Sequence, residues 1–226
     1  MKPQLSIVMP VLNEVAELVG ALQALAELRR AGAELVVVDG GSDDDTVAMC
    51  QAAADLVLIA PRGRARQMNA GAHAASGQWL LFVHADTRLP PGALALVAGQ
   101  LSDGRHNWGR FDVHIAGRSA LLPVIAACMN QRSRLSGIAT GDQAIFVRRQ
   151  VFEVVGGYPD QPLMEDIELS RRLGRLGPPA CLCERVTTSG RRWDQRGAWR
   201  TITLMWRLRL LYWLGVPAER LALAYR

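Results

Sequence analysis

Short, uninterrupted apolar runs alternate with longer amphipathic stretches through the first hundred residues of this chain. Such runs predict strands that are buried on both faces, because neither face carries polar residues at alternate positions. The predicted strands are Leu5–Pro10, Glu34–Val38, Leu56–Ala60 and Trp79–Val83. The stretches with helical spacing predict the helices Glu14–Ala31, Thr46–Ala54, Ala65–Ala75 and Gly92–Leu101. This alternation with short connections predicts an α/β fold with a mostly parallel central sheet flanked by helices.

The rhythm changes after residue 101. Trp108–Ile115 alternates apolar and polar residues, which is typical of an exposed or edge strand. The pattern then predicts a helix, a strand, a charged helix and an apolar helical tail, over Ala120–Arg134, Gln143–Arg148, Glu165–Arg175 and Trp199–Tyr225. Because no repeat or linker interrupts the chain, we expect one domain over residues 1–226, with a nucleotide-type half (1–101), an irregular second half (102–198) and an amphipathic tail (199–226).

The composition is compatible with one large core and a modestly basic surface. The 226 residues are 50% hydrophobic, and the formal net charge of +5 is carried mainly by arginine, which suits bidentate contacts with phosphate or carboxylate groups. We expect no nucleic-acid partner. The four cysteines lack the paired spacing of a zinc site, which favours free thiols in a reducing cytoplasm. We also expect no secretory signal and no spanning helix, and therefore a cytoplasmic location.

Polar residues follow the first two predicted strands. The first strand leads into Pro10-Val11-Leu12-Asn13-Glu14 and not into a glycine triplet, which disfavours a classical NAD or FAD site. Asn13 is a natural cap for the helix that follows. The second strand ends on Asp39-Gly40-Gly41, where the glycines permit a tight turn close to a ligand and the Asp39 carboxylate can accept hydrogen bonds from a base or a ribose.

The third and fourth strands also end on polar groups. Arg62, Arg64 and Arg66 follow the third strand, and they predict either a diphosphate-binding loop or a solvated basic loop. The fourth strand stops on His84-Ala85-Asp86. A carboxylate beside an imidazole at a strand end indicates a metal or phosphate site, although Asp86 could instead cap a turn before the following prolines.

Taken together, these segments resemble the family 2 glycosyltransferases, which have the Rossmann-like GT-A fold. The resemblance rests on SIVMPVLNE, VVVDGGSDDDT, RQMNAGAHAASGQWLLFVHADT and LMEDIELSRRL, and it runs from about Leu5 to Leu173 in the family's order and spacing. The segments TGDQAIFVRR and SGRRWDQRGAWRT are similar to a small bacterial subgroup associated with radical-SAM and selenium-related domains. The resemblance implies transfer of a sugar from a nucleotide-diphosphate donor, UDP-linked, to a small-molecule or lipid-linked acceptor, with inversion.

The resemblance implies roles for the first two loops. Pro10, Asn13 and Glu14 match a loop that contacts the nucleotide, and Asp39 matches the aspartate that binds uracil or ribose. Gly41 belongs to the same donor-binding turn.

It also implies a divalent ion, Mg²⁺ or Mn²⁺. Asp86 matches the last aspartate of the family's Asp-x-Asp metal motif. The chain departs from the pattern at His84, where the first aspartate would stand, and at Gly40, where many members have a second aspartate. A neutral His84 would ligate Mn²⁺ better than Mg²⁺, but it could also orient a ligand or lie in the core.

The pair Glu165-Asp166 matches the acidic pair that follows the sheet in the family. The resemblance implies that Asp166 is the general base, because an acceptor hydroxyl is a poor nucleophile until its proton is taken. The alternative is that both carboxylates complement the helix dipole.

Two further segments are candidates on the acceptor side and over the donor. Asp142 and Gln143 resemble an acceptor-side segment, although Asp142 could simply cap a turn. Arg191, Arg192 and Trp193 fit a lid, with arginines for the diphosphate and tryptophan for a sugar ring; surface charge and packing are the alternatives.

The tail admits three fates: core packing, a dimer contact, or a peripheral contact with the inner face of a membrane. Two other functions also stay open from the sequence. One is nucleotidyl transfer on a related α/β sheet, and the other is a non-catalytic nucleotide-sugar-binding or membrane-associated protein.

Overall fold

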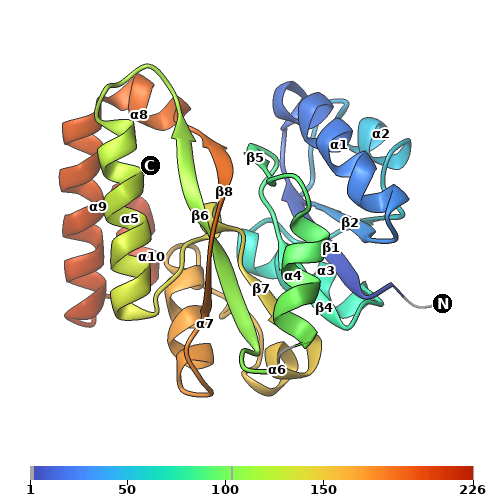
Figure 1. The fold of residues 1–226 in the computed structure, drawn as a ribbon. Helices are drawn as coiled ribbons and strands as arrows, with labels where there is room; N and C mark the ends of the chain where they lie inside the picture. Colours follow the sequence, from blue (N-terminus) through green and yellow to red (C-terminus); the bar gives the residue numbers. More distant parts are fainter. Residues whose placement is uncertain (1–2, 103, 226) are drawn as a thin grey trace.

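The computed structural model describes residues 3–102 and 104–225 (Figure 1). Its strands are β1 Leu5–Val11, β2 Glu34–Asp39, β3 Leu56–Ile59, β4 Trp79–Phe82, β5 Thr87–Arg88, β6 Trp108–Ala116, β7 Phe146–Arg148 and β8 Ala180–Ser189. Its helices are α1 Val15–Arg30, α2 Thr46–Gln51, α3 Arg64–Ala74, α4 Ala93–Ser102, α5 Leu122–Ser136, the 3-10 turn η1 Gly141–Gln143, α6 Arg149–Val154, α7 Glu165–Gly174, α8 Arg191–Arg196, α9 Ala198–Trp213 and α10 Ala218–Tyr225.

One sheet connects both halves of the chain, in the order β3-β2-β1-β4-β7-β6-β8-β5. The first four strands in this order are parallel to one another, as the sequence predicts. Beyond β4 the sheet is mixed: β7 is antiparallel to both β4 and β6, β6 and β8 are parallel, and β5 is antiparallel to β8. The α/β fold class is confirmed, with a more mixed second half than the strand pattern predicts.

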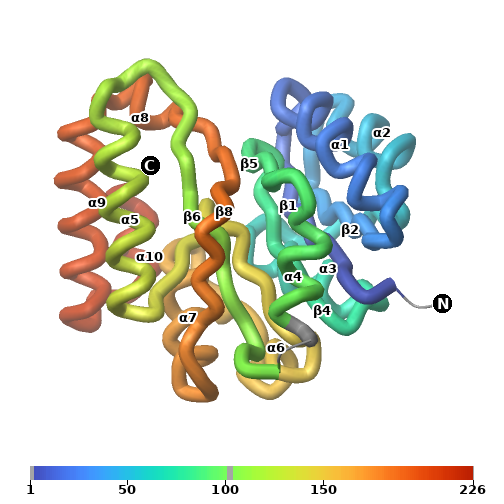
Figure 2. Tube along the Cα trace, viewed as in Figure 1, coloured from blue at the N-terminus to red at the C-terminus, as the bar shows by residue number. Residues whose placement is uncertain are grey.

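Helices cover both faces of the sheet. Successive residues of β1 point to opposite sides, so that Ile7 and Met9 join a core with α1, α4 and α5, whereas Val8 joins a core with α3, α6 and α7. The tube in Figure 2 shows α1 and α2 at one end of the sheet and α5 and α9 at the other. Within the described ranges, no helix has the length and apolar character needed to cross a bilayer.

Strand β6 corrects the expectation of an exposed or edge strand. It lies between β7 and β8, and six of its first residues in a row are buried. Its polar residues mislead because they are paired inside the protein: Arg110 donates to Asp112, and Arg134 donates to the other oxygen of Asp112 at 2.8 Å. Polar alternation here reflects a buried ion-pair network and not contact with water.

Two other expectations change at residues with a positive φ. The strand predicted over 143–148 is shorter, because η1 ends in Ala144 at φ 47° before β7 begins at Phe146. The helical tail is two helices, since Gly215 at φ 87° and Pro217 separate α9 from α10.

Candidate active site

The loops after β1 and β2 are joined to each other at the carboxyl edge of the sheet. The backbone N–H of Asn13 donates to the Ser42 hydroxyl at 2.9 Å, and the Asn13 side-chain oxygen accepts from the Asp43 backbone at 3.0 Å. Asn13 has φ 54°, a conformation that asparagine tolerates better than most residues. The expected cap is not formed: α1 begins after Glu14, and the Asn13 side chain holds the neighbouring loop instead.

Asp39 organises the turn that follows β2. Its side chain is 1% exposed and accepts hydrogen bonds from the backbone of Gly41 at 2.8 Å and of Ser42 at 2.9 Å, and from the Ser42 hydroxyl. Gly41 itself has φ 89°, which explains the glycine at that position. Pro10 lies in the adjacent strand, in register with Val38.

The structure explains the glycine at position 40. A Cβ on Gly40 would lie 3.1 Å from the side-chain amide of Gln67. That amide donates to the carbonyls of Val11 and Val38, both at 2.8 Å, and so bridges β1 and β2. An aspartate at position 40 would have to displace this bridge. Gln67 is a residue that sequence reasoning missed, because glutamine within an amphipathic helix carries no signal of such a role.

Three carboxylates gather around one arginine, and a fourth, Asp86, lies near one of the three. Asp86 follows β4, Asp142 lies in η1, and Glu165 and Asp166 begin α7. The charge of Arg64, at the start of α3, acts on Asp142, Glu165 and Asp166 alike. Burial raises the pKa of Asp142 to about 6, and the nearby charge of Asp86 adds to that rise. The strand ends and the second half of the chain therefore meet at one acidic centre.

The predicted base is held by the backbone. Asp166 accepts hydrogen bonds from the N–H groups of Gly141 at 2.9 Å and Ile167 at 2.8 Å. Burial nevertheless raises the pKa of Asp166, and burial together with the charge of Asp166 raises the pKa of Glu165 to about 7. The preceding residue, Met164, has φ 66°, so the chain enters α7 through a strained conformation.

His84 packs against the same turn. A Cβ on Gly141 would lie 2.6 Å from Cε1 of the His84 ring, so only glycine fits there without displacing the ring. Burial, and then the charge of Arg64, lowers the pKa of His84 to about 3, which keeps the imidazole neutral. The described residues contain no cluster of three or more His, Cys, Asp or Glu side chains arranged to hold a metal.

The three arginines after β3, Arg62, Arg64 and Arg66, have different surroundings. Arg66 forms an exposed ion pair with Asp160 at 2.7 Å, which is the solvated alternative at that position. Arg62 and Arg64 are both exposed, but of these three arginines only Arg64 has a charge that acts on the acidic centre.

Helix α8 brings two more cations toward the site. Arg191 pairs with Glu17 at 3.4 Å and lowers the pKa of Glu14, against the rise that burial and Asp86 cause. The guanidinium of Arg192 lies 4.3 Å from the centre of the Tyr225 ring. Its charge also acts on Asp142.

The segment expected as a lid is a short helix in this conformation. Trp193 is half-buried and packs against the core on the side of α5, which is the packing alternative. Gln143 is buried, where its side chain accepts from the Thr140 backbone at 3.2 Å and donates to Asn130 at 3.4 Å. Both residues therefore have structural contacts, and their contact with an acceptor stays a prediction.

Arg132 is a second residue that sequence reasoning missed. It projects from α5, and its charge acts on Asp166. Its Nε and Nη2 atoms are buried and have no hydrogen-bond partner among the described residues. An arginine in mid-helix carries no sequence signal for such a position.

Comparison with known proteins identifies the family and the fold. Residues 6–154 match the model for the family described as Glycosyl transferase family 2. A PGL/p-HBAD biosynthesis glycosyltransferase from Mycobacterium bovis (strain BCG / Pasteur 1173P2) is 39% identical over 94 residues, which cover 38% of this chain and 37% of the relative. The chain thus spans little more than a third of the length of that curated relative.

Solved structures share the fold. The mannosyltransferase PcManGT from Pyrobaculum calidifontis, in complex with GDP-Man and Mn²⁺, has a TM-score of 0.69 at 19% identity and covers 100% of this chain and 69% of its own. TarS from S. aureus in complex with UDP-GlcNAc has a TM-score of 0.63 at 18% identity, over 84% of this chain and 58% of its own. At these identities the likeness concerns the fold, which is GT-A.

Proposed function

Because this chain belongs to glycosyl transferase family 2, we propose that it moves a sugar from a nucleotide-diphosphate donor, UDP-linked, to an acceptor hydroxyl with inversion. The observation that carries this proposal is the meeting of four carboxylates near the carboxyl ends of the parallel strands: Arg64 acts on Asp142 and on the Glu165–Asp166 pair, and Asp86 acts on Asp142. Open α/β sheets bind their ligands at that edge. The association with radical-SAM and selenium-related domains stays a prediction from the sequence.

Asp166 is the proposed general base. The N–H groups of Gly141 and Ile167 fix its orientation, while its burial raises its pKa and so makes it a better proton acceptor than an exposed aspartate. In the inverting reaction Asp166 takes the proton of the acceptor hydroxyl as the oxygen attacks the anomeric carbon. The bond from that carbon to the diphosphate oxygen breaks, and the nucleoside diphosphate leaves. Glu165, the first residue of α7, is proposed to stabilise the N-terminus of this helix and to line the acceptor side of the site.

The carboxylate oxygens of the acidic centre are ligands that suit a hard divalent cation. Mg²⁺ in such sites takes one or two protein carboxylates and completes its shell with substrate phosphate and water. Asp86 and Asp142 are close enough for the charge of one to raise the pKa of the other, an unfavourable arrangement that a cation relieves. We therefore propose that Asp86 holds Mg²⁺ or Mn²⁺ together with one partner, either Asp142 or the neutral imidazole of His84, and that substrate phosphate and water would complete the shell. A bound cation would offset negative charge on the departing diphosphate.

Three arginines and the strand-end loops are proposed to hold the donor. Arg64, Arg191 and Arg192 supply positive charge on the diphosphate side. On the nucleoside side, Pro10, Asn13, Glu14, Asp39 and Gly41 form the joined loops after β1 and β2. The Asp39 carboxylate already accepts hydrogen bonds from its own turn. Its proposed role is therefore to hold that turn in place beside the base or ribose and to accept one further hydrogen bond from the nucleoside.

A binding screen tests this proposal. We expect UDP with Mg²⁺ or Mn²⁺ to raise the melting temperature, and we expect Asp86→Asn to abolish the metal-dependent part of that rise. Gly174→Ala, in open space at the end of α7, is the matched control and should keep the full rise. Absence of a shift with every nucleoside diphosphate plus metal would refute donor binding. Release of pyrophosphate from a nucleoside triphosphate would instead indicate nucleotidyl transfer.

A further inference from the structure

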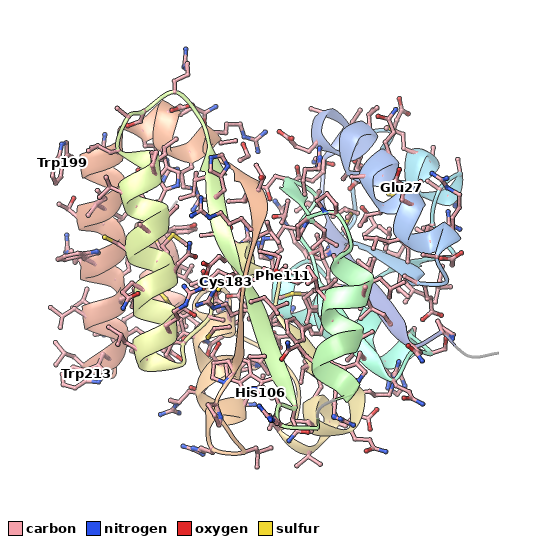
Figure 3. The ribbon with its side chains drawn as sticks, in the orientation of Figure 1. Glu27, His106, Phe111, Cys183, Trp199 and Trp213 are labelled. Atoms are coloured by element: carbon pink, nitrogen blue, oxygen red, sulfur yellow. The ribbon has the colours of Figure 1, made fainter. Side chains whose placement is uncertain are left out.

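The outer face of α9 carries three tryptophans in one line. Trp199, Trp206 and Trp213 are seven residues apart, which is about two helical turns. Their exposed fractions are 70%, 75% and 82%, and Leu210 between the last two is 57% exposed. Figure 3 shows Trp199 and Trp213 projecting outward from the two ends of α9, away from the sheet.

This apolar surface is concentrated and not scattered. Twelve large hydrophobic side chains of the described residues are exposed, and six of them lie in residues 198–225. The other six are dispersed over α1, β3, α5, α6 and the turn after α7, with no more than two on one element, which is normal for a protein surface. A contiguous apolar patch that includes three tryptophans marks a contact surface.

The core does not account for this patch, because it uses the opposite side of α9. Leu208 is 1% exposed and forms a small core with Leu163, Met164 and Leu221. The Tyr212 hydroxyl accepts from the side chain of Gln161 at 3.3 Å on the same side. Helix α9 is therefore apolar on two sides, and only one of them is covered.

Positive charge accompanies the tryptophan line. Helix α9 contains Arg200, Arg207 and Arg209 and no Asp or Glu. A groove of about 580 Å³ lies on another side of α9, toward α8 and α10, with Arg196, Arg200 and Arg207 among its lining residues. Neither Arg200 nor Arg207 forms an ion pair with another part of the described chain. The groove is thus suited to an anionic group such as a phosphate.

We propose that this face docks on an anionic lipid bilayer. The tryptophans would lie at the level of the headgroups, where their apolar rings and polar N–H groups are both accommodated. Arg200 and Arg207 would contact lipid phosphates, and the whole helix would lie in the plane of the interface.

Charge favours a bilayer over a second copy of this chain. In a symmetric dimer through this face, Arg200 and Arg207 of both copies would approach one another, and α9 has no carboxylate to separate them. Like charges brought together at an interface oppose association. An anionic membrane supplies the missing negative charge.

The docked helix also contacts the segment that leads into α7. Leu163 and Met164, which pack on the inner face of α9, directly precede Glu165 and Asp166. Docking therefore holds the residues that lead into the helix of the proposed base against the membrane-bound helix. The acceptor would then be lipid-linked; this last step rests on the proposed function, whereas the docking does not.

Vesicle flotation of the full chain tests the docking. We expect the protein to float with phosphatidylcholine vesicles that contain phosphatidylglycerol, to float poorly with pure phosphatidylcholine, and to be released by salt. The variant Trp199→Ser, Trp206→Ser, Trp213→Ser should remain unbound. The control Ile59→Ser, Val154→Ser removes two side chains of similar exposure (76% each) on other elements and should float like the wild type.

A second variant keeps the test valid if the tryptophan variant misfolds. Arg200→Gln, Arg207→Gln should weaken binding to the anionic vesicles by about 10- to 30-fold. The docking is overturned if the wild type fails to float with either kind of vesicle, or if the tryptophan variant is folded and floats normally. It is also overturned if sedimentation shows a dimer of the wild type that the tryptophan variant no longer forms. UDP binding without vesicles is measured in parallel, so that loss of donor binding is distinguished from loss of docking.

Discussion

The two halves of the sheet hold their polar side chains in different ways. In the first half, Asp39 ends β2 and Asp86 comes shortly after β4. Both strands are parallel and almost entirely buried, so the sheet itself places the two carboxylates at one edge. In the second half, Asp142 lies in a single 3-10 turn. Asp166 is the second residue of α7, and Met164, directly before that helix, has φ 66°. The first half is thus a regular platform, whereas the second depends on local strain that surrounding contacts must hold.

The largest expected effect tests the strained half. Asp166→Asn keeps the size of the side chain but removes the proton acceptor, so we expect kcat to fall by about 10²- to 10⁴-fold with donor binding unchanged. Steady-state kinetics and calorimetry with UDP measure the two quantities. Glu165→Gln is the control and should reduce kcat less. Equal losses in both variants would show that the base has been assigned to the wrong carboxylate.

A smaller effect tests the platform, through two arginines that are two residues apart. Arg64→Ala should lower kcat/KM by about 10- to 150-fold, because a hydrogen bond to a charged diphosphate is lost. Arg66→Ala breaks only an exposed ion pair with Asp160, so we expect no kinetic change and a stability loss below about 1 kcal/mol. If both substitutions gave the same kinetics, Arg64 would not act on the donor.

The halves should also differ in their tolerance of added volume. A Cβ on Gly71 in α3 would lie 2.5 Å from Val8 Cγ1 and 2.8 Å from Val38 Cγ2, so Gly71→Ala should destabilise the protein by about 1–3 kcal/mol. Gly174, at the end of α7, has no neighbour within 4 Å, so Gly174→Ala should be neutral or stabilise by up to about 1 kcal/mol. Urea denaturation measures both; a neutral Gly71→Ala would show that the platform can shift to make room.

The same difference explains what the sequence predicts well. Strands β1 to β4 are continuous apolar runs. Recognising each run locates the carboxyl end of its strand, so the positions of Asp39 and Asp86 at that edge of the sheet could be predicted from the sequence. The pattern of these segments predicts the α/β class, and the GT-A fold is what their resemblance to family 2 glycosyltransferases implies. The pairing of Asp86 with Asp142 could not be predicted, because it depends on how the second half folds back over the strand ends.

Tertiary context hides the second half from sequence patterns. Strand β8 escaped notice because its alternation is interrupted: Phe111 pairs with Leu182 but Asp112 pairs with Arg185, so two residues bulge between them. Strand β6 looked exposed because its buried Arg110 and Asp112 satisfy each other. Polar residues that pair inside a protein have the same sequence pattern as residues that face water.

The last expected effect is a pH dependence and concerns His84, where the two halves meet. Burial lowers the pKa of His84 to about 3 from its ordinary 6.5. Between these pH values the unfolded chain binds more protons than the folded protein. The stability contributed by the neutral imidazole is therefore complete above about pH 6.5 and is lost as the pH falls toward 3, by at most about 1.4 kcal/mol per pH unit.

His84→Asn lacks this titration, so its unfolding free energy should fall less steeply than that of the wild type between pH 6.5 and 5. Urea denaturation with a chelator present separates this effect from metal binding. Parallel slopes for the two proteins would mean that water or a moving Gly141 solvates the imidazolium, and that the contact between the platform and the strained turn is looser than the structure has it. A steeper wild-type slope would show that the two halves close tightly around a neutral His84, as a ligand or an orienting group requires.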